Sequence, residues 1–282
     1  MITGASTGIG AACALHLDGL GFRVFAGVRR ASDGDALRRR GSARLTPLLL
    51  DVTDAGSIAA AADAASETVG PTGLAGLVNN AGIVVAGPLE ILPVEDLRRQ
   101  FEVNVIGLLA VTQALLPLIR RGHGRIVNLG SISGRMASPL VGPYGASKFA
   151  VSALTDVMRL EVQPWGIDVS LVEPGAVATP IWEKSRAASD RLKQIVEPAA
   201  RALYSEAVAA IEAAATRSAN EAIPTDTVVR AVTHALTARR PKTRYLVGTR
   251  ARIQSVIARL PDRLRDRLLT KAIGIPPRNS KT

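Results

Sequence analysis

Cysteine is almost absent from this chain, and aromatic residues are few. Among 282 residues Cys13 is the single cysteine, and Phe, Trp and Tyr together make up 3%. One cysteine excludes an internal disulfide framework and a cysteine-ligated zinc site, and it fits a reducing compartment. Hydrophobic residues still make up 47% of the chain, so the core must be built from aliphatic side chains and alanine. This composition favours a Val/Ile/Leu-rich sheet covered by Ala- and Leu-rich helices.

Targeting and membrane-spanning patterns are missing as well. The opening residues, MITGASTGIG, carry neither the basic segment nor the apolar segment of a secretory signal peptide. No run of about 18 apolar residues occurs, which is roughly the length needed to cross a bilayer. We therefore expect a cytoplasmic protein without a spanning segment.

Excess positive charge is confined to the last part of the chain. Between Arg239 and Thr282 there are thirteen Lys or Arg residues and two acids, which accounts for the whole net charge of +11. The remaining body of the chain is neutral. Since no basic stripe covers the fold, we expect no nucleic-acid partner.

Short apolar runs alternate with helical stretches along most of the sequence. This alternation is typical of an α/β, Rossmann-type, doubly wound parallel sheet, here with about seven strands. Ligands of such sheets bind beyond the carboxyl ends of the strands, so we expect functional residues in the loops that follow them. The expected strands are 1–3, 23–28, 45–50, 74–78, 125–129, 167–172 and 244–247. The expected helices are 8–19, 57–69, 94–120 and 144–162, the third bending or ending at Pro117.

The chain is expected to form one domain with two additions. Residues 1–248 make up the α/β body, and within them the Ala-rich stretch 179–224 is expected to form a helical lid with Trp182, Ile195 and Tyr204 near an apolar pocket. Residues 249–282 form a basic amphipathic extension. Only two residues precede Thr3 in the first strand, whereas a strand normally has about five or six. Either the natural start lies upstream or this strand is trimmed.

A glycine-rich turn joins the first expected strand to the first helix. Gly4 permits the tight turn, Gly8 lets a pyrophosphate approach the backbone, and Gly10 lets helix and sheet pack closely. The helix N-terminus then offers unpaired N–H groups and a partial positive charge to phosphates. The spacing is G-x-x-x-G-x-G rather than the common G-x-G-x-x-G. The turn indicates a dinucleotide site, the alternative being a purely structural turn.

Several further motifs, taken with this turn, resemble the short-chain dehydrogenase/reductase family. The matching pieces are TGASTGIG (3–10), DVTD (51–54), NNAG (79–82), Asn104, Ser131, YGASK (144–148) and PGAVATP (174–180). They occur in the order and spacing of that family across residues 1–180. The segment VFAGVRR, the long lid and RYLVG followed by a basic tail resemble the branch acting on steroids, retinoids and other lipophilic alcohols. The resemblance implies a single Rossmann-type domain and hydride transfer between a dinucleotide and an alcohol or carbonyl.

Tyr144 and Lys148 lie four residues apart in an expected helix, so their side chains share one face. A tyrosine has a pKa of about 10, and a neighbouring ammonium is expected to lower this pKa towards neutrality. The pair would then act as a general acid–base. The resemblance implies that Tyr144 exchanges the proton of the substrate oxygen, that Lys148 also binds the nicotinamide ribose, and that Ser131 holds the substrate oxygen, with Ser133 as its competitor. It implies that the Asn104 carbonyl holds a water near Lys148.

The same resemblance implies the cofactor contacts. Asp51 would bind the adenine amino group, Asn79 would lie near the adenine ribose, and the Val177 backbone and Thr179 hydroxyl would bind the carboxamide. The full set of expected cofactor residues is Gly4, Ser6, Thr7, Gly8, Ile9, Gly10, Arg29, Asp51, Val52, Asn79, Ala81, Gly82, Asn104, Tyr144, Lys148, Pro174, Gly175, Val177 and Thr179.

The residues after the second strand bear on the choice between the two dinucleotides. An acid at this point selects NAD by binding the ribose 2′-hydroxyl, whereas an arginine accommodates the 2′-phosphate of NADP. The chain has Arg29 and Arg30 there, and the first acid is Asp33. We therefore expect NADP(H) rather than NAD(H), with Arg29 as the main cation and Ser6 as a helper. The alternative is that both arginines are a solvated loop pair.

The basic tail contains a helical pattern with an apolar face. Such a helix can lie on an anionic membrane surface, which would make the protein peripheral at the membrane. Alternatively, it packs on the lid or on a second subunit. The apolar stripe consists of Ile253, Val256, Ile257 and Leu260, and a weaker one follows at Leu264, Leu268 and Ala272.

The sequence thus predicts an oxidoreductase for a lipophilic alcohol or carbonyl. Two other functions stay open: a ketoacyl-type reductase of the same family, and a non-catalytic dinucleotide sensor or scaffold. The helices 97–120 and 144–162 correspond to the dimer faces of the family, so a homodimer or homotetramer is expected. No metal site is expected.

Overall fold

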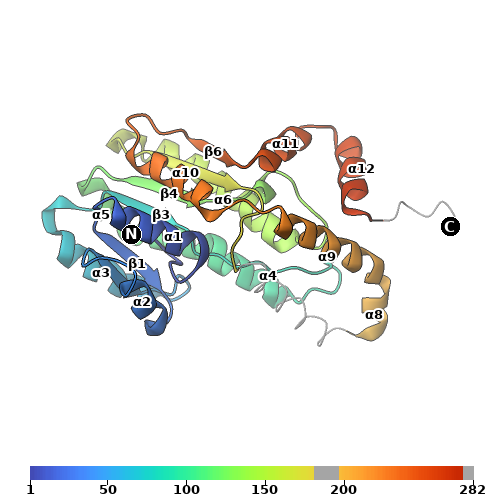
Figure 1. Ribbon diagram of the computed structural model, residues 1–282, viewed down its shortest axis with the longest axis horizontal. Helices are drawn as coiled ribbons and strands as arrows, with labels where there is room; N and C mark the ends of the chain where they lie inside the picture. The colour runs from blue at the N-terminus through green and yellow to red at the C-terminus, as the bar shows by residue number, and fades with distance from the viewer. Residues whose placement is uncertain (181–196, 276–282) are drawn as a thin grey trace.

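A computed structural model describes residues 1–180 and 197–275 of the chain (Figure 1). Its strands pair in parallel, β2 with β1, and β3, β4, β5 and β6 in that order. The strands are β1 (Val24–Val28), β2 (Leu45–Leu49), β3 (Gly76–Asn79), β4 (Arg125–Leu129), β5 (Val169–Pro174) and β6 (Arg244–Val247). The expected α/β class and parallel arrangement are confirmed.

The two groups of strands are joined by the first residues of the chain. Ile2 forms parallel bridges with Ala26 of β1 and with Val78 of β3. The Ile2 N–H donates to the Phe25 carbonyl at 2.9 Å, and the Thr3 N–H donates to the Val78 carbonyl at 3.0 Å. The segment 1–3 therefore takes the central position of a seventh strand, as its sequence predicted, although it is only one bridge long.

Alternating residues of each strand face opposite helical layers. Val24, Ala26 and Val28 point into a hydrophobic cluster shared with α1 (Gly8–Gly19) and α10 (Thr225–Thr237). Phe25 points into the other cluster, shared with α3 (Ala55–Val69), α5 (Gly107–Arg121) and α6 (Gly142–Glu161). Because both faces of the sheet are covered, the strands are apolar on both sides, and the carboxyl edge remains for chemistry.

The helix boundaries differ from expectation at three places. Helix α2 (Ala31–Arg38) was not expected, because its sequence ASDGDALR has little apolar periodicity. Helix α5 does not end at Pro117 but continues to Arg121. Pro117 has no N–H to donate to the carbonyl of Gln113, four residues earlier. Both residues lie on the exposed side of the helix, so water can hydrate that carbonyl and the helix continues. The interruption lies earlier, where the π-helical turn η2 (Glu102–Ile106) joins α4 (Val94–Phe101) to α5.

One described helical stretch, Val94–Arg121, is long and apolar enough to span a bilayer, and an 18-residue window within it has a mean hydropathy of 1.7. The sequence expectation of no such stretch was therefore wrong by length and composition. Val111, Leu115 and Ile119 of this stretch are buried against the sheet. Its apolar character is accounted for by the core, and a core helix passes such a test as readily as a membrane span.

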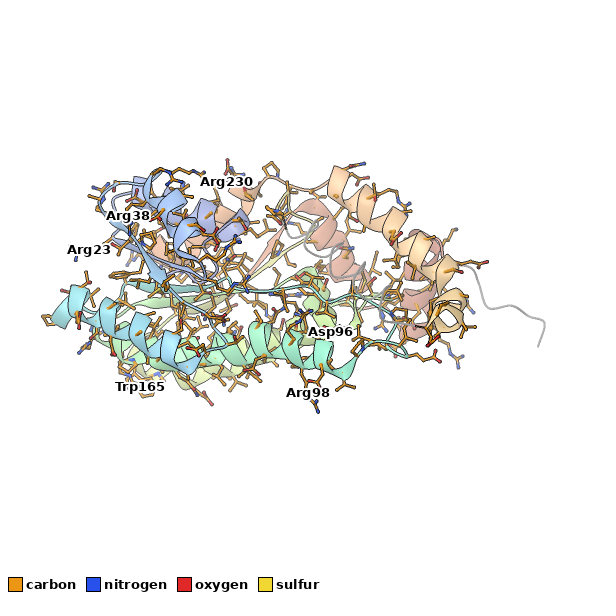
Figure 2. The ribbon with its side chains drawn as sticks, turned by 90° about the horizontal axis from the view of Figure 1, so that it is seen from below. Arg23, Arg38, Asp96, Arg98, Trp165 and Arg230 are labelled. Carbon is orange, nitrogen blue, oxygen red and sulfur yellow. The ribbon has the colours of Figure 1, made fainter. Side chains whose placement is uncertain are left out.

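The outer helical layer is closed at its rim by an aromatic contact. The short 3-10 turn η4 (Gln163–Trp165) follows α6, and Trp165 lies at the outer edge of the layer (Figure 2). The Arg120 guanidinium of α5 sits 4.1 Å from the centre of the Trp165 ring. This cation–π contact links the ends of α5 and α6.

Four helices gather at the end of the molecule near α4 (Figure 1). They are α8 (Pro198–Leu203), α9 (Ser205–Asn220), α11 (Thr249–Ile257) and α12 (Asp262–Ile273). Helix α12 packs on α9, and an ion pair of 2.6 Å joins Arg250 to Glu221. Ala251 of α11 is fully buried. The described part of the tail therefore packs on α9 and beside Gly175; Trp182 and Ile195 of the expected lid lie outside the described residues.

Candidate active site

Ser131 and Tyr144 meet at the carboxyl end of β4. Ser131 is buried and caps the 3-10 turn η3 (Ile132–Gly134), where its Oγ accepts the Ser133 N–H at 3.1 Å. Ser131 also shares a side-chain hydrogen bond with Tyr144 at the start of α6. This contact favours Ser131 over Ser133 as the residue that acts beside the phenol.

Lys148 lies one turn further along α6 and is buried. Its Nζ donates to the Leu129 carbonyl at 2.7 Å, and it lies 5.8 Å from the centre of the Tyr144 ring. Burial lowers the pKa of Lys148 from its usual 10.5 to about 8, because the ammonium loses hydration. The structure thus brings the expected pair together, with the amine held by the end of β4.

The pKa of Tyr144 differs from the expectation. Burial raises this pKa above 10, and the hydrogen bond with Ser131 opposes the rise without cancelling it. The predicted lowering by Lys148 was therefore wrong for the protein alone. The reason is physical: the amine is itself desolvated and points at the Leu129 carbonyl, so its charge does little for the phenol.

Asn104 lies in the π-helical turn η2 and braces the catalytic helix. Its Nδ2 donates to the Ile83 carbonyl and to Ser147 Oγ, both at 3.1 Å, and its Oδ1 accepts the Ile83 N–H at 2.9 Å. Ser147 Oγ in turn donates to the Tyr144 carbonyl at 2.7 Å. π-Helical turns are frequent at functional sites, because they redirect a side chain within a continuous helix. The expected water on the Asn104 carbonyl stays a prediction.

Gln100 supports the same loop and was missed from the sequence. It is fully buried, its Oε1 accepts the Val85 N–H at 2.7 Å, and its Nε2 donates to the Ile83 carbonyl at 2.9 Å. Gln100 and Asn104 thus fix the segment that follows β3 beside the catalytic helix. No residue motif marks a glutamine with this role, so only the fold reveals it.

The glycine turn has the shape that a pyrophosphate requires. Gly4 and Gly8 have φ angles of +64° and +59°, which side-chain-bearing residues rarely adopt. A Cβ on Gly8 would lie 3.3 Å from Thr179, so the glycine turn lies beside residues 175–179, which follow β5 and are expected to bind the carboxamide. Helix α1 begins at Gly8 and has no acid in its first turn, so its partial positive charge is not neutralised there. The predicted Gly4, Ser6, Thr7, Gly8, Ile9 and Gly10 all lie in this turn and at the start of α1, and they fit a dinucleotide.

Asn80 holds this turn against the end of β3. Its Nδ2 donates to the carbonyls of Thr3 and Gly4, each at 3.0 Å. A Cβ on Gly10 would lie 2.4 Å from that same Nδ2, so the third glycine makes room for the amide. The sequence motif NNAG contains Asn80, but only its neighbours were assigned a role.

The Asn79 side chain, expected near the adenine ribose, is engaged inside the protein. It is buried, and its Nδ2 donates to Thr112 Oγ1 at 2.8 Å and to Asn128 Oδ1 at 2.9 Å. These partners lie on α5 and β4, so the side chain links the sheet to the helical layer. The expected position of Asn79 near the adenine ribose stays a prediction.

Four charged residues lie near the expected adenine end of the site: Arg29, Arg30, Asp33 and Asp51. Asp51 follows β2, and the Thr53 backbone N–H holds the pKa of its carboxyl below the usual value, helped by the Thr53 hydroxyl and the Arg29 charge. Arg30 is engaged with Asp33 at 3.0 Å. Arg29 is exposed at the end of β1. Of the two arginines, Arg29 is therefore the one facing the Asp51 side.

Residues 175–179, which follow β5, are held in place by Ile223, which lies shortly before α10. The Ala178 N–H donates to the Ile223 carbonyl and the Ile223 N–H donates to the Ala176 carbonyl, both at 3.0 Å. Val177 between them is buried. Pro174 ends β5, and a Cβ on Gly175 would lie 3.6 Å from Ala251 of α11. The remaining predicted residues Val52, Ala81 and Gly82 follow β2 and β3, on the same carboxyl edge.

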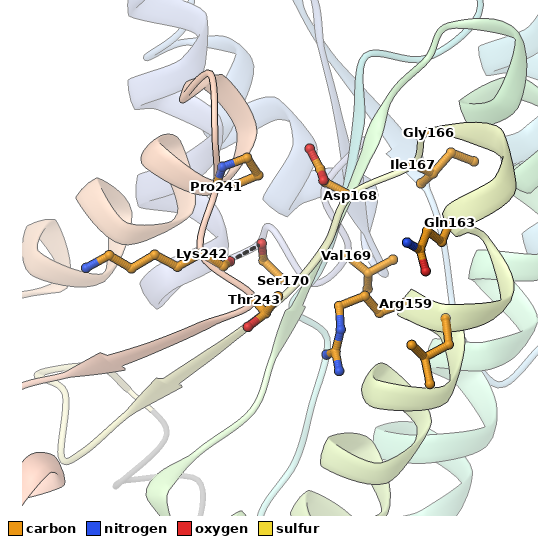
Figure 3. Close-up of a pocket in the computed structure, with 11 residues that line it drawn as sticks. Arg159, Gln163, Gly166, Ile167, Asp168, Val169, Ser170, Pro241, Lys242 and Thr243 are labelled. Atoms are coloured by element: carbon orange, nitrogen blue, oxygen red, sulfur yellow. Dashed lines mark hydrogen bonds between the residues drawn. The ribbon is translucent and has the colours of Figure 1, made fainter.

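A cavity of about 300 Å³ lies at the opposite edge of the sheet (Figure 3). It is formed at the amino ends of β5 and β6, where Ser170 Oγ donates to the Lys242 carbonyl at 2.8 Å. Ser131, Tyr144 and Lys148 lie at the carboxyl end of β4. This cavity is therefore separate from the site described above.

Known proteins resemble the chain over most of its length. The family model of short chain dehydrogenases matches residues 1–190. Retinol dehydrogenase 5 of Mus musculus is 40% identical over 98% of this chain and 88% of its own length. The NADPH-dependent 3-dehydrocapnine reductase of Ornithobacterium rhinotracheale is 32% identical, covering 96% of this chain and 95% of its own.

A solved structure agrees with these sequence matches. A short chain dehydrogenase/reductase from Burkholderia phymatum, in complex with NAD, aligns over 100% of this chain and 96% of its own, with a TM-score of 0.74 and 25% identity. Sequence and structure lead to one assignment: the chain belongs to the short-chain dehydrogenase/reductase family, resembles its steroid and retinoid branch, and is an NAD(P)-dependent oxidoreductase acting on CH–OH groups.

Proposed function

We propose that the protein interconverts a lipophilic alcohol, secondary or at the aldehyde level, and its carbonyl, with NADP(H) preferred and Tyr144 as general acid–base. The observation that carries this proposal is the placement of Ser131, at the end of β4, beside Tyr144 at the start of α6, with the buried amine of Lys148 one helical turn away. Retention of all three groups at one place favours catalysis over a sensor or scaffold role.

In the reducing direction the Tyr144 hydroxyl donates its proton to the carbonyl oxygen as that oxygen gains charge. The Ser131 hydroxyl holds the same oxygen by a hydrogen bond. The bound dinucleotide supplies the hydride to the carbonyl carbon, or accepts it in the opposite direction. Lys148 would bind the nicotinamide ribose. Because its charge does little for the phenol in the protein alone, it would stabilise the phenolate that remains only in the dinucleotide complex. Since the Ser131 hydroxyl already lies beside the Tyr144 phenol before substrate arrives, neither side chain has to reorient much for the reaction.

The proposed preference for NADP(H) rests on Arg29, whose guanidinium is available for the 2′-phosphate. The first acid after β1, Asp33, is engaged by Arg30 and so is poorly placed to select a ribose hydroxyl. Arg29 offers a guanidinium for the 2′-phosphate. Of the proteins compared, one relative is named as NADPH-dependent and one solved structure holds NAD, so the family accommodates both dinucleotides.

A lipophilic substrate is supported by the names of the relatives and by the rim of the site. Retinol dehydrogenase 5 and 17-beta-hydroxysteroid dehydrogenase type 6 are named for apolar alcohols. Near the lid, Leu89 and Leu203 are exposed, and the Tyr204 hydroxyl is bonded to Glu90. The packed tail and lid argue against a ketoacyl-type reductase, because compact members of the family have neither.

A homodimer through α5 and α6 is part of the proposal. Phe149, Val157 and Leu160 are exposed along α6 at spacings that keep them on one side of the helix. Such a row of apolar side chains is suited to a second copy of the same helix. Light scattering of the wild type and of Leu160→Glu checks it: a monomeric wild type would contradict the dimer.

Contact with an anionic membrane is proposed for the tail. Ile253 and Val256 of α11 and Leu264 and Leu268 of α12 are exposed between 41% and 64%. Arginines surround them, and phosphatidylserine-like surfaces attract such charges. At a bilayer surface the apolar side chains can enter the lipid interface while the arginines stay near the anionic headgroups, whereas in water the apolar side chains remain exposed.

Tyr144→Phe is expected to lower kcat by about 10²-fold or more, because the proton donor is removed while the ring remains. The measurement is NADPH oxidation with retinaldehyde, androstanedione, acetoacetate and 2-octanone. Dinucleotide affinity, followed by fluorescence, should change less than about threefold. The control is Tyr245→Phe, which should keep activity. The Tyr245 hydroxyl is hydrogen-bonded to His234 of α10, away from Ser131 and Tyr144. Tight NADPH binding without turnover of any substrate would favour the sensor alternative.

The pH profile of kcat/KM for NADPH is expected to fall as the pH rises through about 8, by about tenfold per unit. The sign follows from the lowered pKa of Lys148: the ammonium that binds the ribose is lost at a lower pH than in water. Tyr144, whose pKa is raised, stays protonated over this range. Lys148→Arg should remove the falling limb, and a limb unchanged in this variant would assign it to another group.

Arg29→Ser is expected to raise the KM for NADPH by about tenfold or more and to leave the KM for NADH nearly unchanged, because only NADPH carries the 2′-phosphate. The matched control is Arg30→Ser, since Arg30 is already paired with Asp33. Equal effects of the Arg29 variant on both dinucleotides would contradict the assignment.

Wild-type protein is expected to sediment with vesicles containing phosphatidylserine and to be released by high salt. Ile253→Ser with Val256→Ser should weaken this binding by about tenfold or more, because each removes apolar surface of about one side chain. Leu49→Ser, an equally exposed leucine at the end of β2, is the control. Deletion of the tail is a poor test, because Ala251 is buried against Gly175. Absent sedimentation of the wild type would refute the membrane proposal.

A further inference from the structure

A completely buried carboxylate lies directly behind the catalytic loop. Glu173, the next-to-last residue of β5, has no exposed side-chain surface. Arg135 meets it with two parallel hydrogen bonds, Nε to Oε1 at 2.7 Å and Nη2 to Oε2 at 2.6 Å. This two-pronged geometry fixes both distance and orientation, which a single ion pair does not.

The pair belongs to a network that ties together four elements. Arg244 of β6 donates to Glu173 Oε1 at 3.3 Å and also to Asp156 of α6. Arg159 of α6 bonds the same Asp156 at 2.7 Å. Glu173 is therefore held from two sides, by Arg135 of the catalytic loop and by Arg244 of the edge strand.

The position of the pair relates it to the reaction. Arg135 directly follows the turn η3, which Ser131 caps, and Glu173 directly precedes the Pro174–Gly175 turn. A Cβ on Gly134 would lie 2.6 Å from the Lys148 carbonyl, so the loop rests on the catalytic helix. A shift of Arg135 therefore moves Ser131 relative to Tyr144.

We propose that Arg135 and Glu173 are positioning residues, which hold the Ser131 hydroxyl against Tyr144 and against the substrate oxygen. This inference rests on the proposed function, in which Ser131 acts on that oxygen. Burying an ion pair contributes little net stability, since the desolvation of both charges offsets their attraction. The contribution of the pair is therefore the fixed geometry that it imposes on the loop carrying Ser131, and not added stability.

The geometry distinguishes arginine from lysine at position 135. Lys would keep the positive charge beside Glu173 but cannot form two parallel bonds to one carboxylate. Arg135→Lys therefore keeps the charge balance and loosens the loop. We expect it to lower kcat by about tenfold, because small displacements of a catalytic group are costly.

A double-mutant cycle tests the inference with the fastest substrate of the panel and saturating NADPH. Ser131→Ala alone should lower kcat by about 10²-fold, the loss typical of a donor to a developing oxyanion. In the Ser131→Ala background, Arg135→Lys should have less than about a twofold further effect, because the residue it positions is gone. Arg159→Lys, which changes the same network at Asp156 without touching Glu173, is the matched control and should change kcat by the same factor in both backgrounds.

The outcomes distinguish the role of Ser131 from the positioning role of Arg135 and Glu173. Coupling of Arg135→Lys with Ser131→Ala supports the inference. A tenfold loss in both backgrounds, or no loss in either, overturns it while leaving the role of Ser131 intact. Full activity of Ser131→Ala overturns the proposed role of Ser131 and this inference together. If Arg135→Lys does not fold, judged by thermal unfolding, Glu173→Gln takes its place in the cycle with the same expectations.

Discussion

The hydrogen bond between Ser131 and Tyr144 is the contact around which the rest of the site is organised. It exists only because two chain segments are held at one edge of the sheet, the loop after β4 and the start of α6. Burial makes the phenol a weak acid when the protein is alone, since a phenolate is poorly solvated there. In the proposed function, charge brought by the bound dinucleotide completes the acid–base pair.

Buried polar side chains behind the site supply the rigidity that this contact requires. On one side Asn104 reaches Tyr144 through Ser147, and Gln100 fixes the neighbouring loop. On the other side Arg135 and Glu173 hold the loop that carries Ser131. Each of these groups is hydrogen-bonded, so the network can be both buried and stable. The resulting site is preformed before substrate enters.

Much of this arrangement follows from the sequence, because glycine turns and helical spacing act locally. The loop from Gly4 to Gly10, the strand segment at Ile2 and the shared face of Tyr144 and Lys148 were predicted from such local patterns. Long-range contacts were not predictable. Nothing local shows that Asn79 would turn into the sheet, that Lys148 would point at Leu129, or that burial would raise the pKa of Tyr144.

The most direct test of the account is the titration of the Tyr144 phenol itself. The chain has three tyrosines, so ¹³C-labelled tyrosine gives few NMR signals, and Tyr144→Phe identifies the relevant one. The account predicts a pKa above 10 in the protein alone and a clear fall when oxidised dinucleotide saturates the site. A pKa at or below 10 in the protein alone, unmoved by the dinucleotide, would contradict it.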